Sequence, residues 1–398
     1  MTAARVPPQI GLYLAVLQFF FALSWIVYVI YLPQLAESAG LPRSVVPWLL
    51  MADQLIFIVC DAAVGIASDR AAAVLGRIGR WVAGATLLSM GAFVALPFVA
   101  PAAGPWGLCA LTVLWAVSSS ALRAPPLTLL GRYVAKPSRP FLIALMLLGS
   151  GVASALAPYL GLTLKQLDPR IPFVLSSLAL AAVAFGMVAA ERALATARTA
   201  APPAAATAGR GAAPIPAFLF AALLAAAAFQ YHANIASAPL YLRHAAAADL
   251  PWLMPVFWVG FNLALLPASL LTKRLGGLPV MAAGVLLAAG CTAAAWAAGS
   301  LGALLAAQSL AGAGWALALM SAFSAAVAFG STGREGAMGG AMNALLAAAA
   351  LGRFGVVVGL APAPAVAIAW AWLPAAGFVL AAGLLLALWR RGAADAAA

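Results

Sequence analysis

Long apolar runs recur along this 398-residue chain, and they limit its possible folds more than any other feature. Each run is close to or above the roughly 20 residues that an α-helix needs to cross a bilayer. The alternating apolar and polar residues of a membrane β-barrel strand are absent. Inside a bilayer, every backbone N–H and C=O group must be bonded within the protein, and helices meet this condition. The sequence therefore predicts an all-α integral membrane protein.

Composition agrees with this prediction and excludes several classes of function. Hydrophobic residues make up 66% of the chain and charged residues 8%, whereas charged residues are roughly 25% of a soluble domain. The net charge of +12 comes from basic residues in short loops between apolar runs, so we expect no nucleic-acid partner. The three cysteines, Cys60, Cys109 and Cys291, lack paired or metal-type spacing, and we expect no metal site.

Twelve runs are long enough to span the bilayer. To within about 2 to 4 residues at each end, they cover residues 10–32, 45–68, 81–100, 106–130, 140–162, 172–190, 216–242, 251–272, 279–298, 301–329, 337–359 and 365–389.

The loops between these runs differ in charge. If the N-terminus is cytoplasmic, only four of the 21 Lys and Arg residues lie outside, namely Arg43, Lys165, Arg170 and Arg243. Two more, Arg123 and Arg353, fall within spans, and the other fifteen lie in the cytoplasm. Because Lys and Arg favour cytoplasmic loops, this bias predicts that both termini are cytoplasmic in a plasma membrane, the inner membrane of a bacterium.

A polar stretch divides the chain into two halves. Residues 191–215 are rich in Ala, Pro and Thr and show no apolar periodicity, which predicts a cytoplasmic linker between helical bundles at 1–190 and 216–398. The tripeptide Pro-Trp-Leu at 47–49 precedes Arg70 by 23 positions, and the same tripeptide at 251–253 precedes Arg274 by 23. This match and the equal span counts favour an internal duplication.

The turn after the second span carries the most specific motif of the chain. It contains Asp61, Gly65 and the pair Asp69-Arg70, followed by Gly76-Arg77 and Arg80-Trp81. This pattern resembles the signature of the major facilitator superfamily, in which a Gly, three residues and Asp-Arg precede a basic turn.

Two details of the motif bear on the branch of that family. The Asp four residues before the Gly, with the longer gap before Gly76, resembles the glycoside-pentoside-hexuronide cation symporters, although Ala62 stands where that branch has Pro and Phe57 where it has a second Asp. The stretch 157–161, Ala-Pro-Tyr-Leu-Gly, is similar to part of the Gly-Pro motif of drug/proton antiporters, so that branch stays open.

The resemblance covers nearly the whole chain and implies two six-helix bundles that alternate access to a central site. It implies a gating role at the cytoplasmic turn for Gly65, Asp69, Arg70 and Arg77. In the family fold, Asp69 and Arg70 would lie against the start of the eleventh span, near Arg334.

Asp61 and Arg123 are charges within spans. Each lies eight residues from the cytoplasmic end of its span, about 12 Å deep at 1.5 Å per residue. A carboxylate at mid-bilayer costs about 2.5 to 3.5 kcal/mol, which an ion pair would reduce. We therefore expect Asp61 to couple transport to H⁺ or Na⁺, with Arg123 as its charge partner. The structural alternative is a fixed ion pair that allows helix packing.

Asp53 and Arg353 lie closer to the opposite side of the membrane. If the second and eleventh spans face one another, as the resemblance implies, these two residues form a bridge that gates the outer side. The alternatives are a fixed pair, or an Arg353 side chain that extends to the interface.

Polar and aromatic residues in three spans are candidate solute contacts. In the seventh span, Gln230, Asn234 and Ser237 follow i, i+4, i+7 spacing and are expected on one side of the helix. His232 is the only histidine within a span, and it either touches solute or is a hydrogen-bonded core residue. The other candidates are Gln18, Trp25 and Tyr28 in the first span and Asn262 in the eighth.

These residues favour a monomeric secondary transporter for a small organic solute, with symport ahead of proton-driven efflux of drugs or metabolites. No phosphate-binding P-loop, HExxH or GxSxG motif is present, so we expect no nucleotide cofactor and no enzymatic activity. An intramembrane enzyme and a transporter-like sensor are the remote alternatives.

Overall fold

The computed structural model describes residues 8–71, 77–199, 215–330, 333–360 and 364–394, and within these ranges the chain is helical and has no β-strand. The first half contains α1 (Pro8–Ser38), α2 (Val46–Ala71), α3 (Arg77–Ser119), α4 (Ala124–Tyr133), α5 (Arg139–Thr163), α6 (Arg170–Ala184) and α7 (Gly186–Thr199). The second half contains α8 (Ile215–Tyr231), α9 (Ser237–Tyr241), α10 (Leu250–Leu253), α11 (Pro255–Leu275), α12 (Gly277–Ala297), α13 (Leu301–Phe329), α14 (Glu335–Leu360), α15 (Pro364–Ala369) and α16 (Leu373–Ala394).

The helices confirm the predicted twelve crossings. Eleven stretches of the described residues are long and apolar enough to span a bilayer. The third, Ile78–Tyr133, has 56 residues, far more than the roughly 20 of one crossing. The chain reverses inside it at Gly104, whose φ of 66° lies in the left-handed region that glycine adopts at little cost. Counted as two crossings, this stretch supplies the third and fourth predicted spans.

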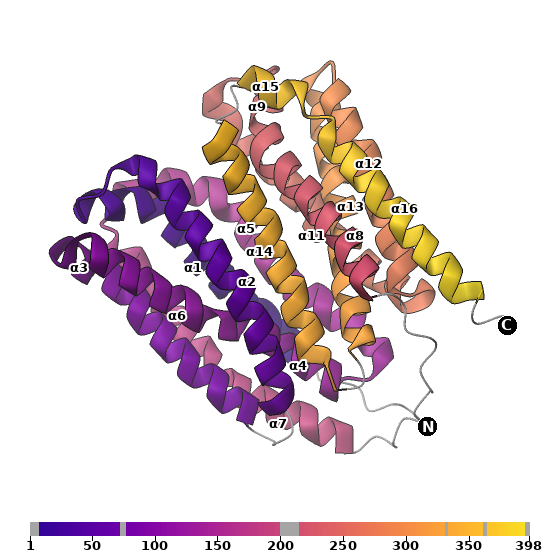
Figure 1. Cartoon of the computed structure of the whole chain (residues 1–398), viewed down its shortest axis with the longest axis horizontal. Coiled ribbons are helices and arrows are strands. Elements are labelled where there is room, and N and C mark those ends of the chain that lie inside the picture. Colours follow the sequence, from indigo (N-terminus) through magenta and orange to yellow (C-terminus); the bar gives the residue numbers. More distant parts are fainter. Residues whose placement is uncertain (1–7, 72–76, 200–214, 331–332, 361–363, 395–398) are drawn as a thin grey trace.

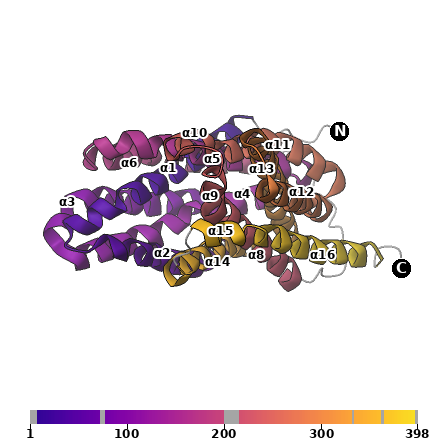
Figure 2. The same cartoon turned by 90° about the horizontal axis from the view of Figure 1, so that it is seen from above.

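Two seams join the halves of the molecule. Helix α2 packs along α14, and α5 packs along α11. Figure 1 shows α2 and α14 side by side, with α4 beside their lower ends. In the view from above, α1, α3 and α6 lie on one side and α11, α12 and α16 on the other, with α5 and α14 between them (Figure 2). The two halves therefore meet along a few helices.

The first part of the predicted linker is helical in the structure. Residues 191–199 belong to α7, and residues 200–214 lie outside the described part of the chain. Helix α7 continues because Glu191 is fully buried and its carboxylate accepts a hydrogen bond of 2.7 Å from the backbone N–H of Gly79 in α3. One buried acid thus ties the end of the first half to the motif-bearing turn.

We call the end of the molecule that holds Ala71 and Glu335 the inner end, and the end that holds Ser38 and Tyr241 the outer end. At the inner end, the backbones of α2 and α14 touch through glycines. A Cβ atom on Gly340 would overlap the carbonyl oxygen of Asp61, and one on Gly65 would overlap the carbonyl oxygen of Gly336. Small residues permit such close approach between membrane helices.

We predict that Gly340→Ala destabilises this structure although alanine is the better helix former. Overpacking against a rigid backbone costs about 1 to 3 kcal/mol, whereas Gly→Ala at an open helix position gains up to about 1 kcal/mol. Gly383→Ala in α16 is the matched control, because no heavy atom lies within 4 Å of its added Cβ. Thermal unfolding of the purified protein should rank Gly340→Ala below the parent and Gly383→Ala level with it or above. Equal unfolding temperatures for the two variants would contradict the close seam.

Candidate functional site

One face of α2 carries two of the candidate charges, Asp53 and Asp61. Its buried residues are spaced three or four apart, as one side of an α-helix requires, apart from the adjacent pair Asp53 and Gln54; they are Leu50, Asp53, Gln54, Phe57, Asp61, Gly65 and Ser68. Both Asp53 and Asp61 are fully buried. Since neither carboxylate reaches the surface, each depends on the partners that neighbouring helices supply.

The structure brings Asp61 and Arg123 together. Nη1 of Arg123 donates to Oδ2 of Asp61 at 2.9 Å, and the Arg123 side chain is 17% exposed. The guanidinium also lies over the ring of Phe57, 3.7 Å from its centroid, one turn before Asp61 on the same helix face. The other carboxylate oxygen, Oδ1, is buried and has no hydrogen-bond partner. The pair is therefore close to neutral as a unit, with one acceptor oxygen free.

A break in the helix sets the position of Arg123. The residues 120–122 form a 3₁₀ turn between α3 and α4, directly before Pro125 and Pro126. A proline has no N–H to donate to the carbonyl four residues earlier, so Pro126 leaves the carbonyl of Leu122 without its helical partner. The side-chain amide of Gln18 donates to that carbonyl at 3.1 Å. Gln18, predicted as a solute contact, is thus engaged in supporting the turn that presents Arg123.

Asp53 and Arg353 do not pair in this structure. The hydroxyl of Tyr28 donates to Oδ2 of Asp53 at 2.9 Å, and Nη1 of Arg353 donates to Oδ1 of Asn234 at 2.8 Å. The guanidinium of Arg353 lies over the ring of Phe354, 3.9 Å from its centroid. Each charge is held by neutral groups of its own half, so the predicted bridge between the halves is not formed here.

The aromatic candidates of α1 pack against one another. Trp25 lies 5.6 Å from Tyr28, 5.6 Å from Phe57 and 5.9 Å from Trp115, between ring centroids. Tyr28 is fully buried, and Trp25 is half-buried. These four rings therefore pack as one cluster, and its member Tyr28 binds Asp53.

The polar stripe of the seventh span is divided by a π-helical turn. Residues His232–Ala236 form this turn between α8 and α9, with five-residue hydrogen bonding in place of four. The wider turn brings His232 and Ser237, five residues apart, to the same side. There, Nε2 of His232 lies 2.9 Å from Oε1 of Gln308 in α13, and Nε2 of Gln308 donates to the Ser237 hydroxyl at 3.0 Å.

The expectation that Gln230, Asn234 and Ser237 share one side is therefore wrong for Ser237. His232 is a buried, hydrogen-bonded core residue in this structure, whereas Asn234 is exposed and donates to Oε1 of Gln230 at 3.0 Å. Gln308 is not among the residues predicted from the sequence, although it is the only amide in a span whose other polar residues are serines, and this contrast is the signal that could have identified it.

The motif at the inner end meets the other half of the molecule. The carboxylate of Asp69 accepts hydrogen bonds from the backbone N–H groups of Gly336 at 2.6 Å and Ala337 at 2.8 Å, at the start of α14. Free N–H groups and the helix dipole make this end a favourable place for a carboxylate. Arg70 and Arg334 are exposed. Helix α3 begins at Arg77, but the side chain of Arg77 lies outside the described part.

Asn262 lies on the second seam rather than beside the other amides. Its Oδ1 is buried without a hydrogen-bond partner, and a Cβ on Gly151 of α5 would overlap it. Asn262 therefore contacts the partner helix of α11 and is separate from the Arg353 and Asn234 pair.

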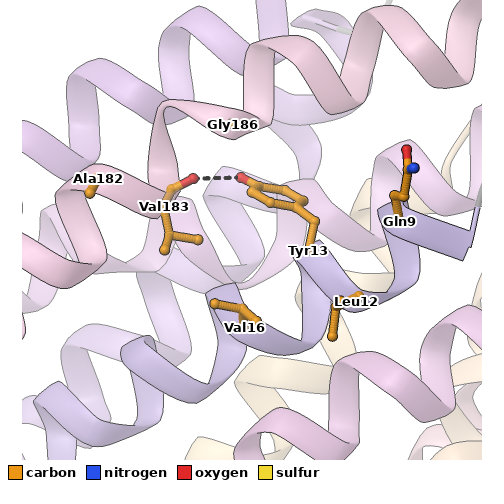
Figure 3. A pocket seen from close by; sticks show the side chains of 7 residues that line it. All are labelled: Gln9, Leu12, Tyr13, Val16, Ala182, Val183 and Gly186. Carbon is orange, nitrogen blue, oxygen red and sulfur yellow. Dashed lines mark hydrogen bonds between the residues drawn. The ribbon is translucent and has the colours of Figure 1, made fainter.

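A separate hollow of about 390 Å³ lies between α1 and α6 (Figure 3). Gln9, Leu12 and Val16 line one side and Val183 the other, and the Tyr13 hydroxyl donates to the Val183 carbonyl at 3.1 Å. None of the predicted site residues lines it. Among the residues described, no three His, Cys, Asp or Glu side chains gather closely enough to hold a metal ion.

Comparison with known proteins gives a family match and several related folds. A family model for the Major Facilitator Superfamily matches residues 14–243, more than half of the chain. Among solved structures, the E. coli fucose:proton symporter FucP is 15% identical with a TM-score of 0.63, and the alignment covers 97% of this chain and 99% of that one. The human organic anion transporter MFSD10 (TETRAN) is 14% identical with a TM-score of 0.69, covering 94% and 97%.

A bacterial homologue of the iron transporter ferroportin, in an outward-facing state with soaked iron, is 15% identical with a TM-score of 0.70, covering 95% and 98%. At these identities the likeness shows the fold alone. The search of curated proteins finds no match.

We predict that Asp69→Asn opens the inner end. An amide binds the N–H groups of α14 more weakly than a carboxylate does. Loss of a cap and its charge costs about 1 to 2 kcal/mol, which shifts the equilibrium between the closed and the open inner end roughly 5- to 30-fold toward the open form. Thr128→Cys reports the opening, because Thr128 is buried at this seam, where its hydroxyl lies 2.7 Å from that of Ser68.

The labelling rate of this cysteine by maleimide, in a protein without its three native cysteines, should rise with Asp69→Asn. Glu37→Gln is the control, because Glu37 is an exposed acid that pairs with Arg43 at the outer end. An equal rate in both variants would show that Asp69 does not hold the inner end closed.

Proposed function

This chain belongs to the major facilitator superfamily of membrane transporters, and we propose that it is a secondary active transporter that moves a small organic solute by alternating access. We further propose that transport is coupled to H⁺ or Na⁺ at Asp61, in symport. The observation that carries the proposal is the buried pair of Asp61 and Arg123, in which one carboxylate oxygen stays free.

The chemistry of coupling follows from this pair. A proton or Na⁺ that binds Asp61 neutralises the carboxylate and weakens its attraction for Arg123. The guanidinium then keeps two cation–π contacts. One is to the ring of Phe57, and the weaker one is to the ring of Phe21, whose centroid is 5.5 Å away. A released cation within the membrane is unfavourable, so Arg123 favours any arrangement that offers a new acceptor. Ion binding at Asp61 thus changes which arrangement of the helices is stable.

The bonds at the two ends supply the gates in this proposal. The inner end is cytoplasmic, in line with the bias of basic residues, and it is closed by Asp69 and the glycines of α2 and α14. We propose that Asp53 and Arg353 approach one another when the outer end closes. The membrane is proposed to be the bacterial inner membrane, with both termini in the cytoplasm.

The direction of transport separates symport from the alternative, proton-driven efflux. The neighbouring folds include a protein named as a fucose:proton symporter, which favours symport as the first test. A thermal-shift screen of sugars, carboxylates, amino acids and cationic dyes, with H⁺ and Na⁺ varied, would find a solute. Flux of that solute in liposomes would then exclude a role as a sensor alone.

We predict that Asp61→Asn abolishes ion-driven accumulation of this solute in membrane vesicles and leaves downhill exchange intact. The amide is not protonated near neutral pH and has no negative charge to neutralise Na⁺, yet it fills the same space as the carboxylate. Accumulation at the parent level in this variant would remove Asp61 from the coupling mechanism.

The double variant Asp61→Asn with Arg123→Gln separates coupling from packing. Arg123→Gln alone leaves an unpaired buried carboxylate, which costs about 3 to 5 kcal/mol, and the second change should restore stability. We expect the double variant to unfold near the parent temperature and still fail to accumulate solute. Recovered accumulation would indicate a fixed structural pair.

A further inference from the structure

Arg353 is a half-buried cation whose hydrogen-bond and ring partners are uncharged. Its Nη1 binds the amide oxygen of Asn234, and its guanidinium lies over Phe354. Its Nε is enclosed and has no hydrogen-bond partner. Among the described residues, no carboxylate lies within the 4.0 Å of an ion pair. Charged groups inside a membrane commonly pair with an opposite charge or mark a ligand pathway, and Arg353 has no such charge partner here.

The other charges far from the helix ends cannot supply this partner in the present arrangement. Asp61 is paired with Arg123, and Asp53 accepts from Tyr28. Within the described part of the spans, Arg353 is therefore a guanidinium that no neighbouring acid pairs with.

The hydrogen bonds around Arg353 all run in one direction. Arg353 donates to Oδ1 of Asn234, and Nδ2 of Asn234 donates to Oε1 of Gln230. Each amide oxygen thereby accepts one hydrogen bond. The groups at the two ends of this row that make no hydrogen bond along it are donors, namely N–H groups of Arg353 and the Nε2 amide of Gln230. A row that ends in donors is suited to a ligand rich in acceptors.

The depth of the row agrees with access from the outer end. Arg353 and Asn234 each lie seven residues from the outer ends of their spans, about 10 Å deep, and Gln230 lies about 6 Å deeper. Asn234 is exposed, whereas Arg353 and Gln230 are half-buried. A polar, exposed Asn234 within a span marks the side that a solute can approach.

We propose that the solute carries a carboxylate, which binds the guanidinium of Arg353 while Gln230 donates to a second acceptor of the same molecule. This inference rests on the proposed function and names its substrate class. Arg43 shows the geometry in the same chain, since its Nε and Nη2 bind the two carboxylate oxygens of Glu37 at 2.5 and 3.1 Å. The same edge of Arg353, formed by Nε and Nη2, makes no hydrogen bond with any described residue. In this proposal the side chain rotates so that its enclosed Nε can reach the carboxylate.

The test compares acids with their neutral amides. Benzoate, succinate and lactate are matched with benzamide, succinamide and lactamide, and binding to the purified full chain is followed by tryptophan fluorescence and thermal shift. At least one acid should bind about tenfold more tightly than its amide. Arg353→Gln should remove this preference, and Arg353→Lys should retain part of it. Arg243→Gln is the control, because Arg243 is an exposed outer-end arginine that binds the Trp296 carbonyl.

Several outcomes would overturn the inference. Equal binding of acids and amides, binding by no acid of the panel, or unchanged acid binding in Arg353→Gln would each do so. Recovery of transport in the exchanged variant Asp53→Arg with Arg353→Asp would overturn it too, because Arg353 would then serve the outer gate alone and not bind the solute. If a neutral sugar such as glucose is accumulated in an Asp61-dependent way, the proposed function stands and only the carboxylate class is wrong.

Discussion

The buried contact between Asp61 and Arg123 is the interaction on which the remaining site depends. Either charge alone near the middle of a span would cost about 2.5 to 3.5 kcal/mol, and the pair reduces this cost to a level that the fold tolerates. Phe57 stabilises the guanidinium from the same face of α2, and Gln18 stabilises the broken turn that presents it. The first bundle therefore holds a charge pair that is stable when complete and unstable when one member is neutralised.

The inner end links this pair to the second bundle. Gly340 of α14 touches the backbone of α2 at Asp61 itself, and Asp69 binds the start of α14 two turns further on. If a change at Asp61 shifts α2, the shift therefore also displaces α14, which is in backbone contact with it. At the outer end, the described residues of α2 and α14 make no comparable polar contact, because Asp53 and Arg353 are each held within their own half.

Much of this structure could be predicted from the sequence, and the exceptions have physical causes. Hydropathy located all twelve crossings, since bilayer thickness fixes their length. Counting residues from the helix ends placed Asp61 level with Arg123, but it placed Asp53 level with Arg353 equally well. Depth sets the height of a residue and says nothing of its direction around the helix. This direction depends on local breaks in the helix. The π-helical turn at His232, for example, points Ser237 toward Gln308, and such breaks do not change the hydropathy of a span.

The most direct test of the account is the protonation state of Asp61 during solute binding. Infrared difference spectroscopy of the reconstituted protein, with and without a bound solute, measures the carbonyl band of a protonated carboxyl group. For proton coupling, we predict a band that appears with solute in the parent and in Asp53→Asn and is missing in Asp61→Asn. For Na⁺ coupling, we predict a Na⁺-dependent change of the carboxylate bands that is likewise lost in Asp61→Asn. A solute-induced signal that is the same in the parent and in Asp61→Asn would contradict the central role of this ion pair.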